Sequence, residues 1–249
     1  MCTRVVYSGK NGMVATGRSM DWKTEMHSNL WVFPKGMERN GETGTNSLKW
    51  TSKYGSVVTS AFEIASTDGM NEKGLVANLL WLPEAEYPIR DQSKPGLAIT
   101  AWVQYMLDNF ATVNEAVAAI DENTFQVVSD LMPDGSRLAT LHLSISDATG
   151  DCAIFEYTSG KLTVYHSKEY KVMTNSPTYN KQLALNEYWK SIGGLSFLPG
   201  TNRPSDRFAR ASFYINALPQ TDDVRIAIAS VFSVIRNTSV PYGISTPEF

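Results

Sequence analysis

The first twenty residues contain the strongest local signal in the chain, a β-hairpin. Two runs that favour strands, 2–8 and 13–20, are separated by the tetrapeptide Gly9-Lys10-Asn11-Gly12. An Asn-Gly pair tolerates the positive φ angles that tight hairpin turns require. The sequence therefore predicts that the chain begins with two antiparallel strands, and that residues near position 20 fold back beside residue 2.

The remaining strands and helices fall into groups along the chain. Further strands are predicted at 56–63, 75–82, 139–146, 152–157 and 161–166, and helices at 97–110, 113–121, 178–190, 204–217 and 222–236. The helix at 113–121 has a capping signal, because Thr112 precedes it and Glu115 follows three residues later. Grouped strands and helices favour an α+β fold over alternating parallel units. The Pro/Gly-containing segments 83–96 and 192–204 are expected to be surface loops.

Composition limits the classes of function. A chain of 249 residues that is 43% hydrophobic and 19% charged fits a single domain over 1–249. The net charge of -3 comes from scattered basic and acidic residues, so we expect binding neither to nucleic acid nor to an anionic membrane surface. The two cysteines and three histidines do not have metal-ligand spacing, so no metal site is indicated.

The compartment depends on what precedes the chain. No stretch approaches the roughly 18 to 20 apolar residues of a spanning helix, and the N-terminus lacks the features of a secretory leader. We expect a cytoplasmic protein, or a periplasmic one if a natural leader precedes Met1.

Cys2 has a property that no internal cysteine shares. If Met1 is removed, as aminopeptidases generally do when the next side chain is small, Cys2 carries both a thiol and a free α-amine. An α-amine titrates close enough to neutral pH to accept the thiol proton, so nucleophile and base would lie on one residue. Its position alone, however, favours a cysteine that merely follows the initiator methionine and has no catalytic role.

The predicted hairpin brings two charged side chains to the same end as Cys2. An Arg18 guanidinium there would stabilise a thiolate, and an Asp21 carboxylate could orient the amine. These two residues are three apart, so strand alternation puts them on opposite faces. Both can face Cys2 only if the strand bulges or ends before Asp21. The alternative for this pair is an ordinary surface ion pair at a strand end.

Motifs spread along the chain carry a family resemblance. They are MCTRVVY at 1–7, GRSMDW at 17–22, DGMNEKGL at 68–75, MTNSPTY at 173–179, LPG at 198–200 and SDRFARASF at 205–213. Together they resemble the choloylglycine hydrolase family, which contains penicillin V acylases and bile salt hydrolases. The resemblance implies an αββα four-layer sandwich of the N-terminal-nucleophile hydrolase type. It also implies cleavage of linear amide C–N bonds without a metal or organic cofactor, and a homotetramer.

Family members usually continue beyond the segment that resembles the last residues printed here. We therefore expect the sandwich to lack its C-terminal strands. Three alternatives stay open for the chain: a fragment, a protein whose remainder forms a second chain, or a shortened family member.

The resemblance assigns catalytic roles to five side chains. Cys2 would be the nucleophile, supported by Arg18 and Asp21. Asn175 would donate to the oxyanion of the tetrahedral intermediate, and Arg207 would complete the polar site. Taken locally, Asn175 before Ser-Pro instead favours an Asx turn, and Arg207 could be a solvated residue at a helix start. Three further residues are expected to be structural: Asn71 and Gly74 in a turn, and Cys152 in a buried strand.

A tryptophan pair bears on the substrate. Trp22 and Trp81 resemble the pair found in Gram-negative penicillin V acylases, some of which also cleave N-acyl homoserine lactones. The backbone amide of Trp81 would be the second oxyanion donor. Two indoles beside the thiol would form a flat apolar slot for an aryl or alkyl acyl group, better suited to phenoxyacetyl than to a hydroxylated steroid. The other four tryptophans are expected in the core: Trp31, Trp50, Trp102 and Trp189.

The expected activity is therefore that of a penicillin V acylase acting on a small-molecule amide. Two alternatives remain. One is a conjugated bile salt hydrolase, and the other is a catalytically inactive family member that binds amides or an assembly partner.

Overall fold

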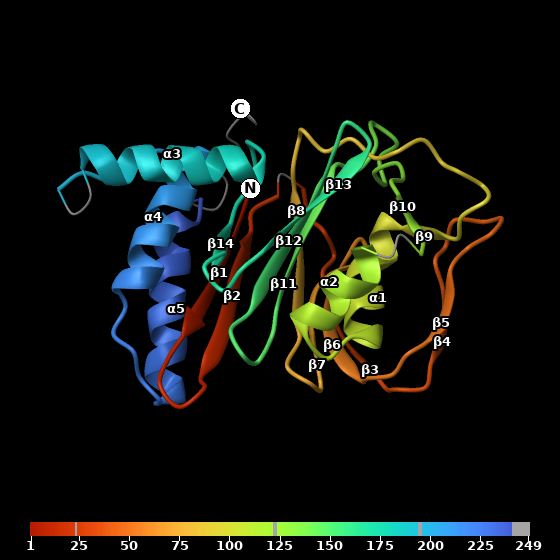
Figure 1. Cartoon of the computed structure of the whole chain (residues 1–249), viewed down its shortest axis with the longest axis horizontal. Helices are drawn as coiled ribbons and strands as arrows, with labels where there is room; N and C mark the ends of the chain where they lie inside the picture. The colour runs from red at the N-terminus through yellow and green to blue at the C-terminus, as the bar shows by residue number, and fades with distance from the viewer. Residues whose placement is uncertain (23, 122–123, 194–195, 241–249) are drawn as a thin grey trace. The chain divides into compact units, whose positions relative to one another are not determined.

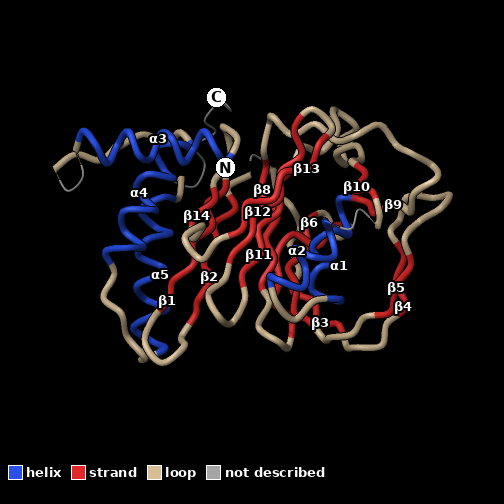
Figure 2. The backbone as a smooth tube through the Cα atoms, viewed as in Figure 1, coloured by secondary structure: helices blue, strands red, loops and turns tan. Residues whose placement is uncertain are grey.

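The computed structural model describes residues 1–22, 24–121, 124–193 and 196–240. The chain divides into two compact units: the first comprises 1–25, 80–84 and 168–249, and the second comprises 26–79 and 85–167. Each unit combines a β-sheet with α-helices (Figures 1 and 2). This mixture confirms the α+β class that the sequence predicts.

The first unit has a sheet in the order β14–β1–β2, with both pairings antiparallel. Helices α4 and α5 pack on β1, α5 also packs on β2, and α3 packs on α4 (Figure 1). The central strand β1 is buried from Cys2 to Tyr7. The elements are β1 (Cys2–Ser8), β2 (Val14–Met20), β14 (Val172–Met173), α3 (Tyr179–Ile192), α4 (Pro204–Ala217) and α5 (Val224–Thr238).

The predicted hairpin is confirmed. Its turn contains Asn11 at φ 53° and Gly12 at φ 76°, the left-handed conformations that an Asn-Gly pair permits. In β2, a Cβ atom on Gly17 would lie 2.4 Å from Cγ1 of Val231 in α5. A glycine at this position therefore lets the helix lie directly on the strand.

The second unit has a sheet in the order β13–β12–β11–β8–β7–β6–β3. Helix α1 packs on β6 and β7, and α2 packs on β12. The sheet strands are β3 (Leu30–Phe33), β6 (Ser56–Ala61), β7 (Ala65–Asn71), β8 (Val76–Trp81), β11 (Leu141–Ser146), β12 (Cys152–Thr158) and β13 (Lys161–His166). The other elements are β4 (Glu38–Asn40), β5 (Lys49–Thr51), β9 (Gly96–Ala98), β10 (Gln126–Val128), α1 (Trp102–Asn109) and α2 (Val113–Asp121).

Several local predictions in this unit are confirmed. The capping of α2 is present, because the amide of Glu115 donates to the Thr112 hydroxyl at 3.2 Å. Asn71 stabilises a turn before β8, with Oδ1 accepting from the amides of Lys73 and Leu75, both at 3.0 Å. Gly74 in this turn has φ 84°, and Cys152 is a fully buried residue of β12.

Two local predictions are wrong, and one strand is not predicted. The helix expected at 97–110 begins only at Trp102, because residues 96–98 form β9, paired in parallel with β10, and a 3-10 turn follows. Strand β7 was not predicted, since its sequence ASTDGMN is polar, yet it pairs with both β6 and β8. Trp31, expected in the core, is 46% exposed on the edge strand β3.

Candidate active site

The register of the hairpin places Arg18 beside the thiol of Cys2. Cys2 pairs with Met20 and Arg4 with Arg18, and residues directly opposite each other in antiparallel strands share a face. Arg18 Nη2 lies 3.5 Å from the Cys2 sulfur, while Nη1 donates to the Met20 sulfur at 3.2 Å. Cys2 is only 3% exposed. The guanidinium is thus placed to stabilise a thiolate.

Strand β2 ends at Met20, so Asp21 lies just outside it. Strand alternation therefore does not force Asp21 onto the face opposite Arg18. The backbone of Asp21 pairs with Met1: the Asp21 amide donates to the Met1 carbonyl at 2.6 Å, and the Met1 ammonium donates to the Asp21 carbonyl. Burial raises the pKa of the Asp21 carboxyl, although the N-terminal ammonium, Arg207 and Arg18 favour its charged form. The carboxyl therefore lies in the electrostatic field of both the N-terminus and the arginines.

Asn175 reaches Cys2 from the other side of β1. Strand β14 pairs Met173 with Arg4, and continuing that register by two residues puts Asn175 opposite Cys2. The Cys2 amide donates to Asn175 Oδ1 at 2.8 Å, and Asn175 Nδ2 donates to the Trp81 carbonyl at 2.7 Å. Nitrogen and oxygen of the Asn175 amide are thereby distinguished by their partners.

Arg207, on the first turn of α4, connects these groups. It is completely buried, and its guanidinium donates to the Cys2 carbonyl at 2.5 Å and to Asn175 Oδ1 at 2.8 Å. It also donates to the Thr3 hydroxyl at 2.6 Å. Burial lowers the pKa of Arg207 to about 10, while negative charge on Cys2 and Asp21 favours its protonated form. The alternative of a solvated arginine at a helix start is therefore wrong.

Trp22 and Trp81 form an aromatic pair next to this network. Their ring centroids are 5.4 Å apart, and the rings are tilted by 54°. Trp81 is 5% exposed and Trp22 is half-buried. Since the Trp81 carbonyl accepts the hydrogen bond from Asn175, the pair is anchored to the residue expected to bind the oxyanion.

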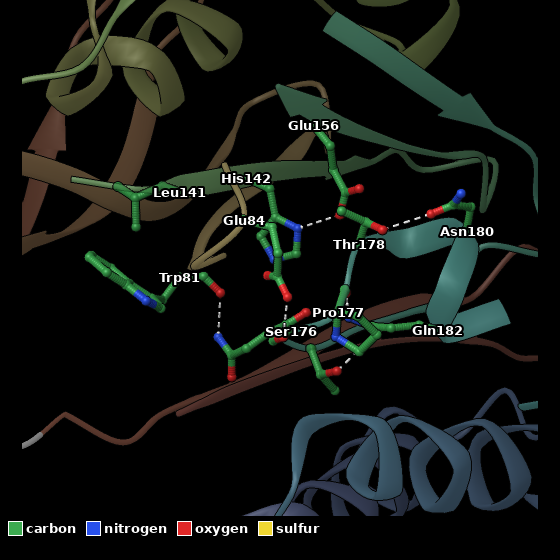
Figure 3. A network of polar contacts seen from close by, with 12 residues as sticks. Trp81, Glu84, Leu141, His142, Glu156, Ser176, Pro177, Thr178, Asn180 and Gln182 are labelled. Carbon is green, nitrogen blue, oxygen red and sulfur yellow. Dashed lines mark hydrogen bonds and ion pairs between the residues drawn. The ribbon is translucent and has the colours of Figure 1, made fainter. Parts of the chain in front are cut away.

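Sequence reasoning missed the residues that hold the Asn175 turn. The Ser176 hydroxyl donates to Glu84, and the Gln182 side chain donates to the carbonyls of Asn175 and Pro177 (Figure 3). In the sequence, Gln182 is recognisable only as a polar residue on the inner face of a predicted helix. Its role can be assigned only when the position of the neighbouring turn is known.

Neither a metal-binding cluster nor a membrane-spanning helix occurs in the part of the chain that the structure describes. Within it, no group of three or more His, Cys, Asp or Glu side chains could hold a metal ion. The helices in the same part of the chain are too short or too polar to cross a membrane.

The chain is similar to known proteins over nearly its whole length. Residues 2–248 match the family model of the linear amide C–N hydrolases, choloylglycine hydrolase family. The chain is 51% identical to the penicillin V acylase of Pectobacterium atrosepticum, over 99% of this chain and 71% of that protein.

Solved structures give the same result. The penicillin V acylase from Agrobacterium tumefaciens matches with a TM-score of 0.92 and 62% identity, over 99% of this chain and 75% of that one. The C2A mutant of the conjugated bile acid hydrolase from Clostridium perfringens matches with a TM-score of 0.79 and 26% identity, over 99% and 82% of the two chains. These likenesses confirm the expected fold class, that of the N-terminal-nucleophile hydrolases.

The contact between Arg18 and Cys2 predicts a change in thiol reactivity. Arg18→Gln removes the cation that stabilises the thiolate, so alkylation of Cys2 by iodoacetamide at pH 7 should slow by about 3- to 10-fold. The measurement is peptide mass spectrometry of Cys2 against time. The control is Arg225→Gln, on the exposed start of α5. Equal alkylation rates in the wild-type and Arg18→Gln proteins would show that Arg18 does not act on the thiol.

Proposed function

Because this chain belongs to the linear amide C–N hydrolases of the choloylglycine hydrolase family, an amide-hydrolysing group of enzymes, we propose that it uses Cys2 to hydrolyse phenoxyacetyl amides. The observation that carries the proposal is the set of contacts around Cys2. Its thiol faces the Arg18 guanidinium, its nitrogen faces the Asn175 amide, and its carbonyl is held by Arg207.

The mechanism begins with removal of Met1, which converts the Cys2 nitrogen into an amine. This nitrogen already lies 2.8 Å from Asn175 Oδ1, which can accept a hydrogen bond from the amine. The amine then takes the thiol proton, and Arg18 stabilises the thiolate. Asp21 interacts with the Met1 ammonium of the uncleaved chain, so after Met1 is removed it would favour the ammonium that forms on Cys2.

Attack of the thiolate on the substrate carbonyl carbon forms a tetrahedral intermediate with a negative oxygen. Asn175 Nδ2 carries two hydrogens, of which one is directed to the Trp81 carbonyl, so the other is available for this oxygen. We assign the second donor to the backbone amide of Trp81. Losing one such donor typically costs about 2.7 to 4 kcal/mol of transition-state stabilisation.

The intermediate collapses when the C–N bond breaks and the leaving amine takes a proton from the Cys2 ammonium. The acyl group then remains on the sulfur as a thioester. In the second half-reaction the Cys2 amine removes a proton from water, and the resulting nucleophile displaces the thiolate. The carboxylic acid product leaves and the thiol is restored.

The acyl group would occupy the apolar surface of Trp22 and Trp81. Tilted indole rings offer flat surfaces to an aryl or alkyl group, and few polar groups to the hydroxyls of a steroid. The relatives named penicillin V acylase, at 51% and 62% identity, also support this substrate class over the bile acid hydrolase at 26%. N-acyl homoserine lactones are a second candidate, because their alkyl chains fit the same surface.

The direct test of the proposal is Cys2→Ser. Its hydroxyl is a far weaker nucleophile than a thiolate when the base is an α-amine, so kcat for a phenoxyacetyl amide should fall by several orders of magnitude. Circular dichroism would verify that the fold is retained, and Cys152→Ser is the matched control at the other cysteine. Turnover by Cys2→Ser at the wild-type rate would contradict the proposed mechanism.

The tryptophan pair predicts substrate preference. Trp81→Ala removes an apolar wall but keeps the backbone amide, so binding of aryl and alkyl acyl groups should weaken by about 1 to 3 kcal/mol. We also expect the unmutated protein to prefer a phenoxyacetyl amide over glycocholate. Both expectations are measured as ratios of kcat/KM. A preference of the wild-type protein for glycocholate would overturn the substrate class and leave the Cys2 mechanism standing.

A further inference from the structure

A glutamine of α3 holds the backbone of the turn that carries Asn175 (Figure 3). Gln182 is completely buried. Its Nε2 donates to the carbonyl oxygens of Asn175 and Pro177, the second at 2.7 Å, and its Oε1 lies 2.9 Å from the Thr174 hydroxyl. Both donor hydrogens and an acceptor position of this one amide are therefore used on residues 174–177.

The same turn is held on its side chains by residues 81–84. Asn175 Nδ2 donates to the Trp81 carbonyl at 2.7 Å, and the Ser176 hydroxyl donates to Glu84 Oε1. This segment therefore fixes the side chains of the turn, whereas Gln182 fixes its backbone carbonyls.

The orientation of the Asn175 amide depends on both anchors. Its Nδ2 must lie about 2.7 to 3.1 Å from the position that the oxyanion will occupy, and a displacement of about 1 Å can cost 10²-fold in rate. Without Gln182, the carbonyls of Asn175 and Pro177 would lose a buried donor, and the turn would shift to recover hydrogen bonds. Such a shift moves the donor that binds the oxyanion.

We infer that Gln182 is a positioning residue for amide hydrolysis, acting through Asn175 from a helix that supplies none of the assigned catalytic residues. The inference rests on the proposed function, because it assumes that Asn175 binds the oxyanion. Gln182 has no contact with the Cys2 thiol among the described hydrogen bonds, so its effect on the reaction passes through the turn.

The first measurement is steady-state kinetics of Gln182→Met, which keeps the length of the side chain and removes both donors. With a phenoxyacetyl amide as substrate, kcat should fall by about 10- to 100-fold and KM should change by less than about threefold, because the lost interaction belongs to the transition state. The control is Asn186→Leu, one turn further along α3, where another buried polar side chain is replaced. It should retain kcat within about twofold.

The decisive measurement is a double-mutant cycle with Asn175→Ala. If Gln182 acts through Asn175, adding Gln182→Met to Asn175→Ala should lower kcat by less than about threefold further. Effects that multiply in the double variant would overturn the inference, since a general loss of structure acts with or without Asn175. If Gln182→Met does not fold, the near-isosteric Thr174→Val, which removes the hydroxyl next to Gln182 Oε1, takes its place in the same cycle.

The outcomes separate this inference from the proposed function. A large loss of kcat in Asn175→Ala, with none in Gln182→Met, would overturn the positioning role and leave the function intact. Unchanged activity in Asn175→Ala would contradict the proposed oxyanion donor, and the positioning role with it.

Discussion

The pairing of β1 on both of its edges is the constraint on which the candidate site depends. On one edge, the register with β2 aligns Cys2 with Met20 and brings Arg18 to the thiol. On the other edge, the register with β14 brings Asn175 to the Cys2 nitrogen. A slip of one residue in either register would turn the partner side chain to the opposite face. The close packing of α5 on β2, which the lack of a side chain at Gly17 permits, helps to hold this sheet in place.

Arg207 fixes the positions of Cys2 and Asn175, but burying its charge costs free energy. A fully buried guanidinium loses its hydration, and the loss is offset only when its donors are satisfied. Here they reach the carbonyls of Cys2 and Asn202, the Thr3 hydroxyl and Asn175 Oδ1. Because Asn175 Oδ1 also accepts from the Cys2 amide, one buried cation fixes the backbone of Cys2 and the side chain of Asn175 together. Removing any partner would leave buried polar atoms without hydrogen bonds.

The sequence correctly predicts the elements whose structure depends on a few neighbouring residues. The Asn11-Gly12 turn, the strands it joins and the capped helix α2 follow from backbone preferences over a few residues. Strand β7 and the start of α1 could not be predicted in the same way, because pairing with distant strands overrides local propensity there. Asn175 and Arg207 lie 173 and 205 residues from Cys2, so only family resemblance brought them into the site. Gln182 was missed for a related reason. The spacing of apolar residues predicts a helix, but it does not predict which turn the inner face of that helix contacts.

In the proposed reaction the N-terminal cysteine, with its own amine as base, forms an acyl-enzyme. Intact mass measured before and after rapid mixing with a phenoxyacetyl amide, followed by an acid quench, tests it most directly. We expect a chain that lacks Met1 and that gains one phenoxyacetyl group, located on Cys2 by peptide mapping. Turnover of the amide by a chain that still carries Met1, or an acyl group found on any other residue, would contradict it.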